Sequence, residues 1–169
     1  EQLTTQCYRI QALLNTGLDN QGLEKAKKLW QSTKKDFPSD CSGMLRQLQS
    51  NQVLNNSDYW QRVSLLIANN RLSAARNLVP FLNESDQKFV ELWLEVRSAP
   101  AKKMPDLLLL PNSEQLRAIM VDAIKEIADE NLQTALPLWA QAQTSFKFTE
   151  LEKGEVESRL GMWEAWRHD

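Results

Sequence analysis

Paired carboxylates are the residues of this 169-residue chain whose type and spacing could do chemistry. Two carboxyl groups that flank a glycosidic bond can act as an acid and a base, or as an acid and a nucleophile. Acids in the first turn of a helix also interact favourably with the helix dipole, and aspartate is common at turns between helices. For each group we prefer a structural role to a catalytic one. We therefore assign no catalytic residue. The groups considered are Glu84 with Asp86, Asp129 with Glu130, and the series Glu150, Glu152, Glu155 and Glu157.

Other kinds of catalytic or cofactor chemistry lack the residues they need. The single histidine, His168, stands beside Arg167 and Asp169 at the end of the chain, and we interpret it as part of a solvated terminus. One histidine and two cysteines, Cys7 and Cys41, do not form a zinc-ligand pattern or a Ser/His/Asp arrangement. Five scattered glycines do not make a phosphate-binding loop. The sequence predicts no metal and no cofactor.

The basic residues form small clusters rather than a continuous patch. A net charge of −2 argues against a nucleic-acid surface, which normally has a clear basic excess. Helical periodicity places most of the first cluster on a solvent-facing side, and contact with an anionic polymer is the alternative. The clusters are Lys25, Lys27 and Lys28; Lys34 and Lys35; and Lys102 and Lys103.

Six tryptophans are many for a chain of this length. Aromatic rings can stack on sugars, but Trp30, Trp60 and Trp139 fall on apolar stripes, and we expect them in the core. Trp163 and Trp166 lie near the end of the chain and could pack onto a part of the protein beyond it.

The elements that must position these residues are helices. Apolar residues recur at helical spacing nearly everywhere, and about ten helices joined by short turns are expected to pack as antiparallel pairs. Many short helices, each with a modest core, indicate a solenoid. The predicted fold class is all-α, a superhelical α-solenoid, with residues 1–169 as one segment. A Pro-rich connection permits a subdivision into 1–98 and 112–169.

No apolar run approaches the roughly 18 residues of a membrane-spanning helix, so we expect no membrane span. The chain begins at Glu1 without a methionine and shows no signal peptide, which fits a processed or trimmed product.

Capping residues predict where several helices begin and end. Gly17 is expected at the C′ position of the first helix. The Pro-rich segment 99–111 predicts a loop with one short helix at about 106–109, and Pro137 lies inside a helix expected over 132–142. The predicted N-terminal caps are Ser39, Ser57, Ser113 and the capping box of Thr149 with Glu152.

A short pattern occurs three times and predicts a helical repeat. It places a leucine, an alanine three residues later, a leucine three further, and then a large apolar residue. The small alanine lets a neighbouring helix approach closely between the flanking leucines. The copies begin at Leu23, Leu72 and Leu132, with their alanines at Ala26, Ala75 and Ala135.

The two cysteines leave two interpretations open when only their number is considered. An even count is compatible with one disulfide in an oxidising compartment, and two unrelated buried thiols are equally compatible with it.

The first 45 residues resemble a known family. The chain has Thr4-Thr5-Gln6-Cys7, then Asn15-Thr16-Gly17, Ala26-Lys27-Lys28-Leu29-Trp30, and Cys41. This order is similar to the superhelical region of soluble lytic murein transglycosylases from Gram-negative bacteria. The chain departs from the family at Gln6, where arginine is expected, and at Lys28, where glutamate is expected. Neither change touches the packing stripe.

The resemblance implies a periplasmic protein and a Cys7–Cys41 disulfide. Family members cleave the β-1,4 bond between N-acetylmuramic acid and N-acetylglucosamine and leave a 1,6-anhydromuramic product. Their superhelix surrounds a lysozyme-like catalytic domain with a Glu-Ser motif. Glu84-Ser85 and Glu157-Ser158 match that dipeptide, but the accompanying Gly-Leu-Met-Gln and Ala-Tyr-Asn motifs are missing, so we transfer the catalytic role to neither glutamate.

The resemblance thus implies a non-catalytic superhelical segment whose partners are its own catalytic domain, absent from this chain, and, through the full-length enzyme, peptidoglycan. Two alternatives remain: a free-standing helical-repeat adaptor that binds a protein partner, and an enzyme whose acid is Glu84 or Glu157.

Overall fold

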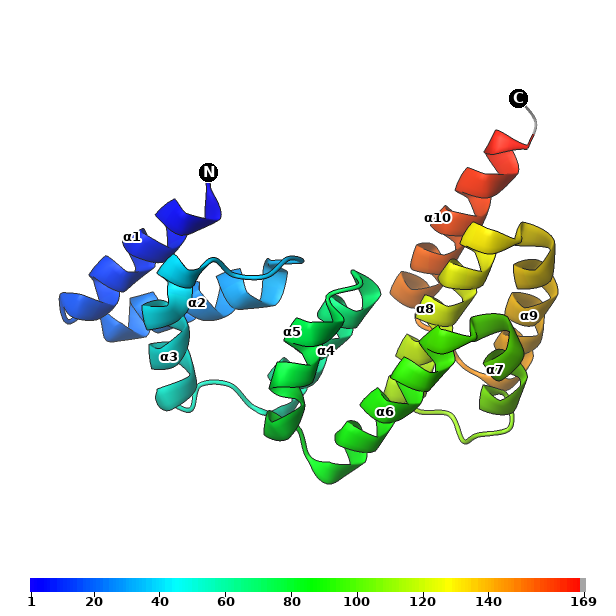
Figure 1. Cartoon of the computed structure of the whole chain (residues 1–169), viewed down its shortest axis with the longest axis horizontal. Coiled ribbons are helices and arrows are strands. Elements are labelled where there is room, and N and C mark those ends of the chain that lie inside the picture. The colour runs from blue at the N-terminus through cyan, green and yellow to red at the C-terminus, as the bar shows by residue number, and fades with distance from the viewer. Residues whose placement is uncertain (168–169) are drawn as a thin grey trace. The chain divides into compact units, whose positions relative to one another are not determined.

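The computed structural model describes residues 1–167, and all regular structure within them is helical (Figure 1). The chain divides into two compact units, the first of residues 1–83 and the second beginning at Glu84. The elements of the first unit are α1 (Leu3–Asn15), α2 (Asp19–Ser32), η1 (Ser39–Cys41), α3 (Ser42–Ser50), α4 (Asn56–Ala68), α5 (Leu72–Leu78) and η2 (Val79–Phe81). Those of the second unit are α6 (Glu84–Ser98), α7 (Pro100–Leu107), α8 (Glu114–Glu130), α9 (Leu132–Ser145) and α10 (Glu150–Trp166).

Two antiparallel hairpins, α1 with α2 and α4 with α5, make up most of the first unit. Helix α3 packs against both helices of the first hairpin, and α2 also contacts α4. Large apolar side chains fill the interior of the unit because each helix turns one apolar face inward. The most deeply buried of them are Met44, Leu48, Val63, Leu66 and Ile67.

Helix α8 is the centre of the second unit. It contacts α6, α7, α9 and α10, so nearly all of its faces are covered. Nine of the thirteen residues from 116 to 128 are apolar, which gives this part of the helix a wide apolar face to pack against its neighbours. The fully buried side chains on α8 are Leu116, Ile119, Met120, Ala123 and Ile124.

The repeated alanine lies in the second helix of a hairpin in all three copies. Ala26 on α2, Ala75 on α5 and Ala135 on α9 have exposures of 0%, 1% and 0%. Each of these helices packs against the helix that precedes it, namely α1, α4 and α8. A side chain of one carbon allows two backbones to come close, which is why these sites take alanine. The sequence repeat therefore marks a structural hairpin.

Gly22 extends the same close contact at the first hairpin. A Cβ atom at this position would lie 2.7 Å from Leu14 Cδ2 and 3.2 Å from the Leu14 backbone nitrogen. A larger residue would require the Leu14 side chain to move and would remain tight against the α1 backbone.

Several predicted helix ends are confirmed. Gly17 has a φ of +80°, and the Leu18 amide donates to the Leu13 carbonyl at 3.2 Å, as in a glycine C-cap. The Ser113 hydroxyl accepts from the Leu116 amide, as the sequence predicts. The capping box of Thr149 and Glu152 is also present with both of its hydrogen bonds.

Two predicted caps are wrong. Asn55, rather than Ser57, caps α4, because its side chain accepts from the Asp58 amide while the Asp58 carboxylate accepts from the Asn55 amide. This reciprocal pair satisfies two otherwise unpaired N–H groups, whereas Ser57 already lies inside the helix. Ser39 begins the 3₁₀ helix η1, and neither η1 nor α3 has a side-chain cap.

The predicted layout of the Pro-rich segment is also wrong. Its helix, α7, covers Pro100–Leu107 rather than residues 106–109, and it lies inside the second unit. Pro100 occupies the first helical position, where its fixed φ suits a helix and its missing N–H costs nothing. The segment therefore starts a helix where we expected a loop.

Candidate functional site

The acids on α6 lie in different environments. Glu84 has a side-chain exposure of 86% and pairs with Lys88 at 3.4 Å, one helical turn away. Asp86 is buried and accepts a hydrogen bond from Gln115 Nε2 at 3.2 Å. Residues two apart on a helix do not face each other, so the two carboxylates do not act as a pair on one substrate bond.

Asp129, at the end of α8, is engaged by α10. Its carboxylate accepts from Arg159 Nη1 at 2.6 Å and from Trp163 Nε1 at 2.8 Å. Glu130 is exposed. Asp129 therefore joins two helices, and its two oxygens are both used.

The α10 acids are exposed or structural. Glu152 closes the capping box and also accepts from Arg117 Nε at 3.0 Å, which ties the start of α10 to α8. Glu150 is fully solvated and 3.5 Å from Lys153, and Glu155 and Glu157 are exposed. None of the four faces an enclosed site.

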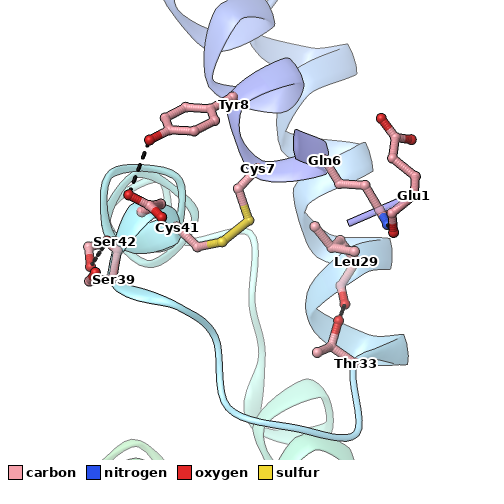
Figure 2. The surroundings of a disulfide bond; sticks show 10 residues. Glu1, Gln6, Cys7, Tyr8, Leu29, Thr33, Ser39, Cys41 and Ser42 are labelled. Carbon is pink, nitrogen blue, oxygen red and sulfur yellow. Dashed lines mark hydrogen bonds between the residues drawn. A yellow bond between two sulfur atoms is a disulfide. The ribbon is translucent and has the colours of Figure 1, made fainter. Parts of the chain in front are cut away.

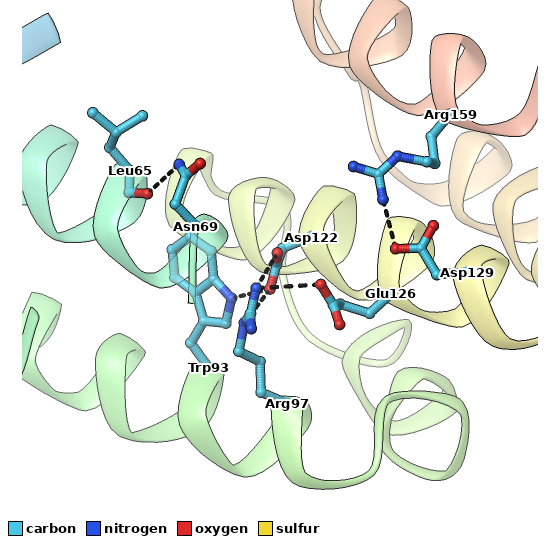
Figure 3. A network of polar contacts seen from close by, with 8 residues as sticks. All are labelled: Leu65, Asn69, Trp93, Arg97, Asp122, Glu126, Asp129 and Arg159. Atoms are coloured by element: carbon cyan, nitrogen blue, oxygen red, sulfur yellow. Dashed lines mark hydrogen bonds and ion pairs between the residues drawn. The ribbon is translucent and has the colours of Figure 1, made fainter. Parts of the chain in front are cut away.

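A buried polar network between α6 and α8 was missed by sequence reasoning (Figure 3). Asp122 accepts from Trp93 Nε1 at 2.8 Å, from Arg97 Nε at 2.9 Å and from Arg97 Nη2 at 2.9 Å. Arg97 Nη2 also reaches Glu126 at 3.4 Å. The sequence feature that could have indicated this network is Asp122, which lies among apolar residues of α8. Charged residues are almost never fully buried unless they are paired. The geometry joins two helices and leaves no carboxylate oxygen of Asp122 free for proton transfer.

A second buried charge, Arg62, holds the connection that follows α2. Its guanidinium donates to the carbonyl oxygens of Thr33 and Lys35 and lies 5.1 Å from the centre of the Phe37 ring. Burial lowers the pKa of Arg62 to about 10, and the opposing charge of Asp36 raises it in part. The side chain is still protonated at neutral pH, so it anchors the segment as a cation.

The Cys7–Cys41 disulfide joins α1 to η1 (Figure 2). Its Cα atoms are 5.2 Å apart and both side chains are buried. Next to it, the Tyr8 hydroxyl donates to Asp40 Oδ1 at 3.1 Å, and this hydrogen bond raises the pKa of Tyr8 above its usual value. The disulfide implied by the family resemblance is thus present, and it ties α1 to η1 across the segment that contains α2.

The predicted burial of three tryptophans is confirmed, whereas Trp163, which we expected to pack onto a part of the protein beyond the chain, is hydrogen-bonded to this chain's own Asp129. Trp30, Trp60 and Trp139 are buried in their units. Trp163 is partly covered and donates to Asp129, while Trp166 has an exposure of 74%. Of these rings, only that of Trp166 presents a large free face.

Four lysines of the first two clusters, namely Lys25, Lys28, Lys34 and Lys35, border two connected grooves on the first unit. One groove, of about 540 Å³, is bordered by Lys34, Lys35 and Arg71. The other, of about 370 Å³, is bordered by Arg9, Lys25 and Lys28. The predicted solvent exposure of these lysines is confirmed, and the same side chains surround a concave surface. This groove pair is the candidate binding site of the chain.

The other lysines lie elsewhere. Lys27 turns toward Asp58 and pairs with it at 3.1 Å. Lys102 is exposed and Lys103 partly buried on α7, in the second unit.

The first unit is basic although the whole chain is slightly acidic. Residues 1–83 contain ten Lys and Arg against six Asp and Glu, a net charge of +4. The remaining residues contain ten Lys and Arg against sixteen Asp and Glu, a net charge of −6. The groove therefore lies on the cationic unit.

Within residues 1–167, no set of three His, Cys, Asp or Glu side chains is placed to hold a metal ion. Over the same residues, no helix has the length and apolar character needed to cross a membrane. His168 lies outside the described residues.

Three solved structures that resemble this chain come from lytic transglycosylases. An inactive mutant of lytic transglycosylase Slt from Pseudomonas aeruginosa matches 98% of this chain with a TM-score of 0.84 and 20% identity. The 70 kDa soluble lytic transglycosylase Slt70 from Escherichia coli matches 96% with a TM-score of 0.68 and 19% identity. A complex of the 70 kDa soluble lytic transglycosylase with bulgecin A matches 96% with a TM-score of 0.71 and 16% identity.

This chain spans about a quarter of each of those chains, 26 or 27%. No protein-family model and no curated protein sequence matches it. At these identities the likeness establishes the fold, and it confirms the predicted class, an all-α solenoid built from antiparallel helix pairs.

Proposed function

We propose that this chain is a non-catalytic helical segment of a lytic transglycosylase that cleaves the glycan strands of peptidoglycan. The observation that carries the proposal is the fold likeness, which covers nearly all of this chain and only about a quarter of the lytic transglycosylases it matches. A segment of such an enzyme would have this relation to the whole.

A second line of support comes from the sequence and does not depend on the fold. The Thr4-Thr5-Gln6-Cys7 start resembles the same family, and the family's cysteine pair corresponds to the Cys7–Cys41 bond. Disulfides persist in oxidising compartments such as the bacterial periplasm, where peptidoglycan is turned over. We accordingly propose a periplasmic location.

In this proposal the segment is a scaffold that shapes access to the glycan strand, and the chemistry belongs to a separate catalytic domain. That domain would cleave the bond between N-acetylmuramic acid and N-acetylglucosamine and form the 1,6-anhydromuramic product. The environments of Glu84 and Glu157 support this division, because both side chains are exposed to solvent. A glycosidase acid normally needs a pocket that raises its pKa.

Incubation of the purified chain with murein sacculi, followed by chromatography of the soluble products, tests the proposal. We expect retention of the chain on sedimented sacculi and no release of anhydromuropeptides. Release that is abolished in Glu84→Gln or Glu157→Gln would show that the segment is itself an enzyme. Failure to sediment with sacculi, together with a full-length gene that lacks a transglycosylase domain, would favour the free-standing adaptor instead.

A further inference from the structure

The connected grooves between α1 and α2 combine an apolar floor with a basic rim. We propose that this groove pair binds short acidic peptides, and that its ligands are the stem peptides that branch from peptidoglycan strands. The first part concerns ligand chemistry alone, and the second rests on the proposed function.

The two grooves form one continuous surface. Glu1, Gln6, Leu29 and Ser32 line both of them, and Figure 2 shows Glu1, Gln6 and Leu29 on the same side of the disulfide. On α1 the lining runs from Leu3 to Leu13, which at 1.5 Å per residue is about 15 Å. An extended peptide of about four or five residues has this length.

The floor is apolar where the two helices meet. Leu3, Ile10 and Leu13 from α1 and Leu29 from α2 line it. Gln6, Ser32 and Asn69 lie among them, and each already donates one hydrogen bond, to the Glu1, Leu29 and Leu65 carbonyls respectively. Their side-chain oxygens can accept hydrogen bonds from the N–H groups of a peptide backbone. A peptide with small apolar side chains complements both kinds of surface.

Six cations of residues 1–167 border the groove pair, and two of them are already paired with carboxylates, one of which, Glu1, itself lines both grooves. Arg9 is paired with Glu1 at 2.9 Å, and Lys28 with Glu24 at 2.9 Å.

Four further cations, by contrast, form no ion pair with a carboxylate of residues 1–167. They are Lys25, Lys34, Lys35 and Arg71, and all four are exposed. Arg71 is held at the turn between α4 and α5, where its amide donates to the Leu66 carbonyl at 2.8 Å. A ligand with several carboxylates would neutralise this cluster.

An acidic peptide fits better than an anionic polysaccharide. A densely charged polysaccharide would bind the basic residues, but its polar surface would not cover the four apolar side chains of the floor favourably. The free energy that comes from burying apolar surface would then not contribute to binding. A stem peptide supplies carboxylates and alanine methyl groups within a few residues. The groove therefore matches the peptide part of peptidoglycan and leaves the sugar chain to the rest of the enzyme.

Two-dimensional NMR titration of the chain with a synthetic stem tetrapeptide tests the proposal directly. We expect saturable shifts confined to Leu3, Gln6, Leu29 and their neighbours. Affinity should fall as salt is raised, because exposed charges are screened beyond about 10 Å at 0.1 M salt. The same peptide with its carboxylates amidated should bind about tenfold more weakly.

A matched pair of variants separates the groove from general electrostatics. Lys34→Gln, Lys35→Gln and Arg71→Gln together remove three groove cations and should weaken binding about tenfold. A triple variant outside the groove removes the same charge and should bind as the parent does. It combines Arg46→Gln, Arg76→Gln and Lys102→Gln, all at exposed positions.

Several results would overturn the proposal. The first is an equal loss of peptide affinity in the two triple variants, and the second is binding of the amidated peptide with unchanged affinity. The third is a set of NMR shifts that lie outside the groove. The fourth is binding of heparin at the groove without binding of the peptide. Peptide binding by a protein whose full-length gene lacks a transglycosylase domain would refute the proposed function and leave the acidic-peptide site standing. A transglycosylase domain in the gene without peptide binding would refute only the site.

Discussion

Replacing Asp122 by asparagine removes the charge from the buried network between α6 and α8 while keeping the shape of the side chain. Both partners are well covered: the side-chain exposures of Arg97 and Asp122 are 11% and 5%. Asparagine has one acceptor oxygen in place of two, and its NH₂ group would face the N–H groups of Arg97. The variant therefore leaves a buried guanidinium without its main counter-charge.

The expected cost follows from that geometry. Removal of one partner of a buried ion pair typically costs about 3 to 5 kcal/mol. Glu126 remains 3.4 Å from Arg97 and is partly exposed, so it can compensate in part. We therefore expect a loss of about 3 kcal/mol in the free energy of unfolding of the second unit. Replacement of both Asp122 and Arg97 by leucine and methionine should cost less than the single change, because no uncompensated charge remains.

Hydrogen exchange measured residue by residue is the suitable assay, because the chain has two compact units and a single unfolding transition is not assured. Protection of the α8 amides should fall in the Asp122→Asn variant, while protection in α1 and α2 should stay the same. A change of less than about 0.5 kcal/mol in α8 would refute the view that this network stabilises the second unit.

Three further predictions concern the first unit. Replacing Cys7 and Cys41 by serine should cost the unit about 4 kcal/mol in the chain-entropy account, since the bond spans 34 positions, and urea unfolding with and without reductant measures this. Gly22→Ala should lower the free energy of unfolding by about 1 kcal/mol, because an overpacking cost of about 1 to 3 kcal/mol against Leu14 exceeds the roughly 1 kcal/mol that alanine gains in a helix; a raised urea midpoint would contradict the close contact. Tyr8 should titrate above the usual tyrosine pKa, and Asp40→Asn should lower its pKa, as an ultraviolet pH titration can follow. Because the folded pKa is raised, the stabilising effect of this hydrogen bond is present at neutral pH and is lost as pH rises through the folded pKa.

Much of the fold was predictable because its signals are local. Helical periodicity, the glycine after α1 and the capping box before α10 depend on residues a few positions apart. The alanine repeat could also be recognised in the sequence, because each copy is buried in a hairpin of two consecutive helices.

The errors arose where local signals compete. Asn55 and Ser57 are both good caps, and the choice is decided by Asp58, which returns a hydrogen bond to Asn55. A proline such as Pro100 is equally compatible with a loop and with the first position of a helix, so the sequence alone does not decide between them.

The polar sites were harder to predict because they depend on residues distant in sequence. Asp122 pairs with residues 25 and 29 positions away, and nothing in either segment alone indicates its partner. The groove likewise brings Lys25, Lys34 and Arg71 to one surface only when α1, α2 and the α4–α5 turn come together. In the sequence these residues appear as separate small clusters and as one isolated arginine.

The alanine-centred hairpins have a consequence for how the chain acquires its structure. Each hairpin joins consecutive helices, so its contacts form between residues that are near one another along the chain, and proteins rich in such contacts fold quickly. The first hairpin can assemble as soon as about 32 residues are free, and its close packing at Ala26 does not wait for later segments. Its cysteine partner follows nine residues after α2 ends. A hairpin that has already formed holds Cys7 near the place that Cys41 will occupy, so oxidation would lock a contact that folding has prepared.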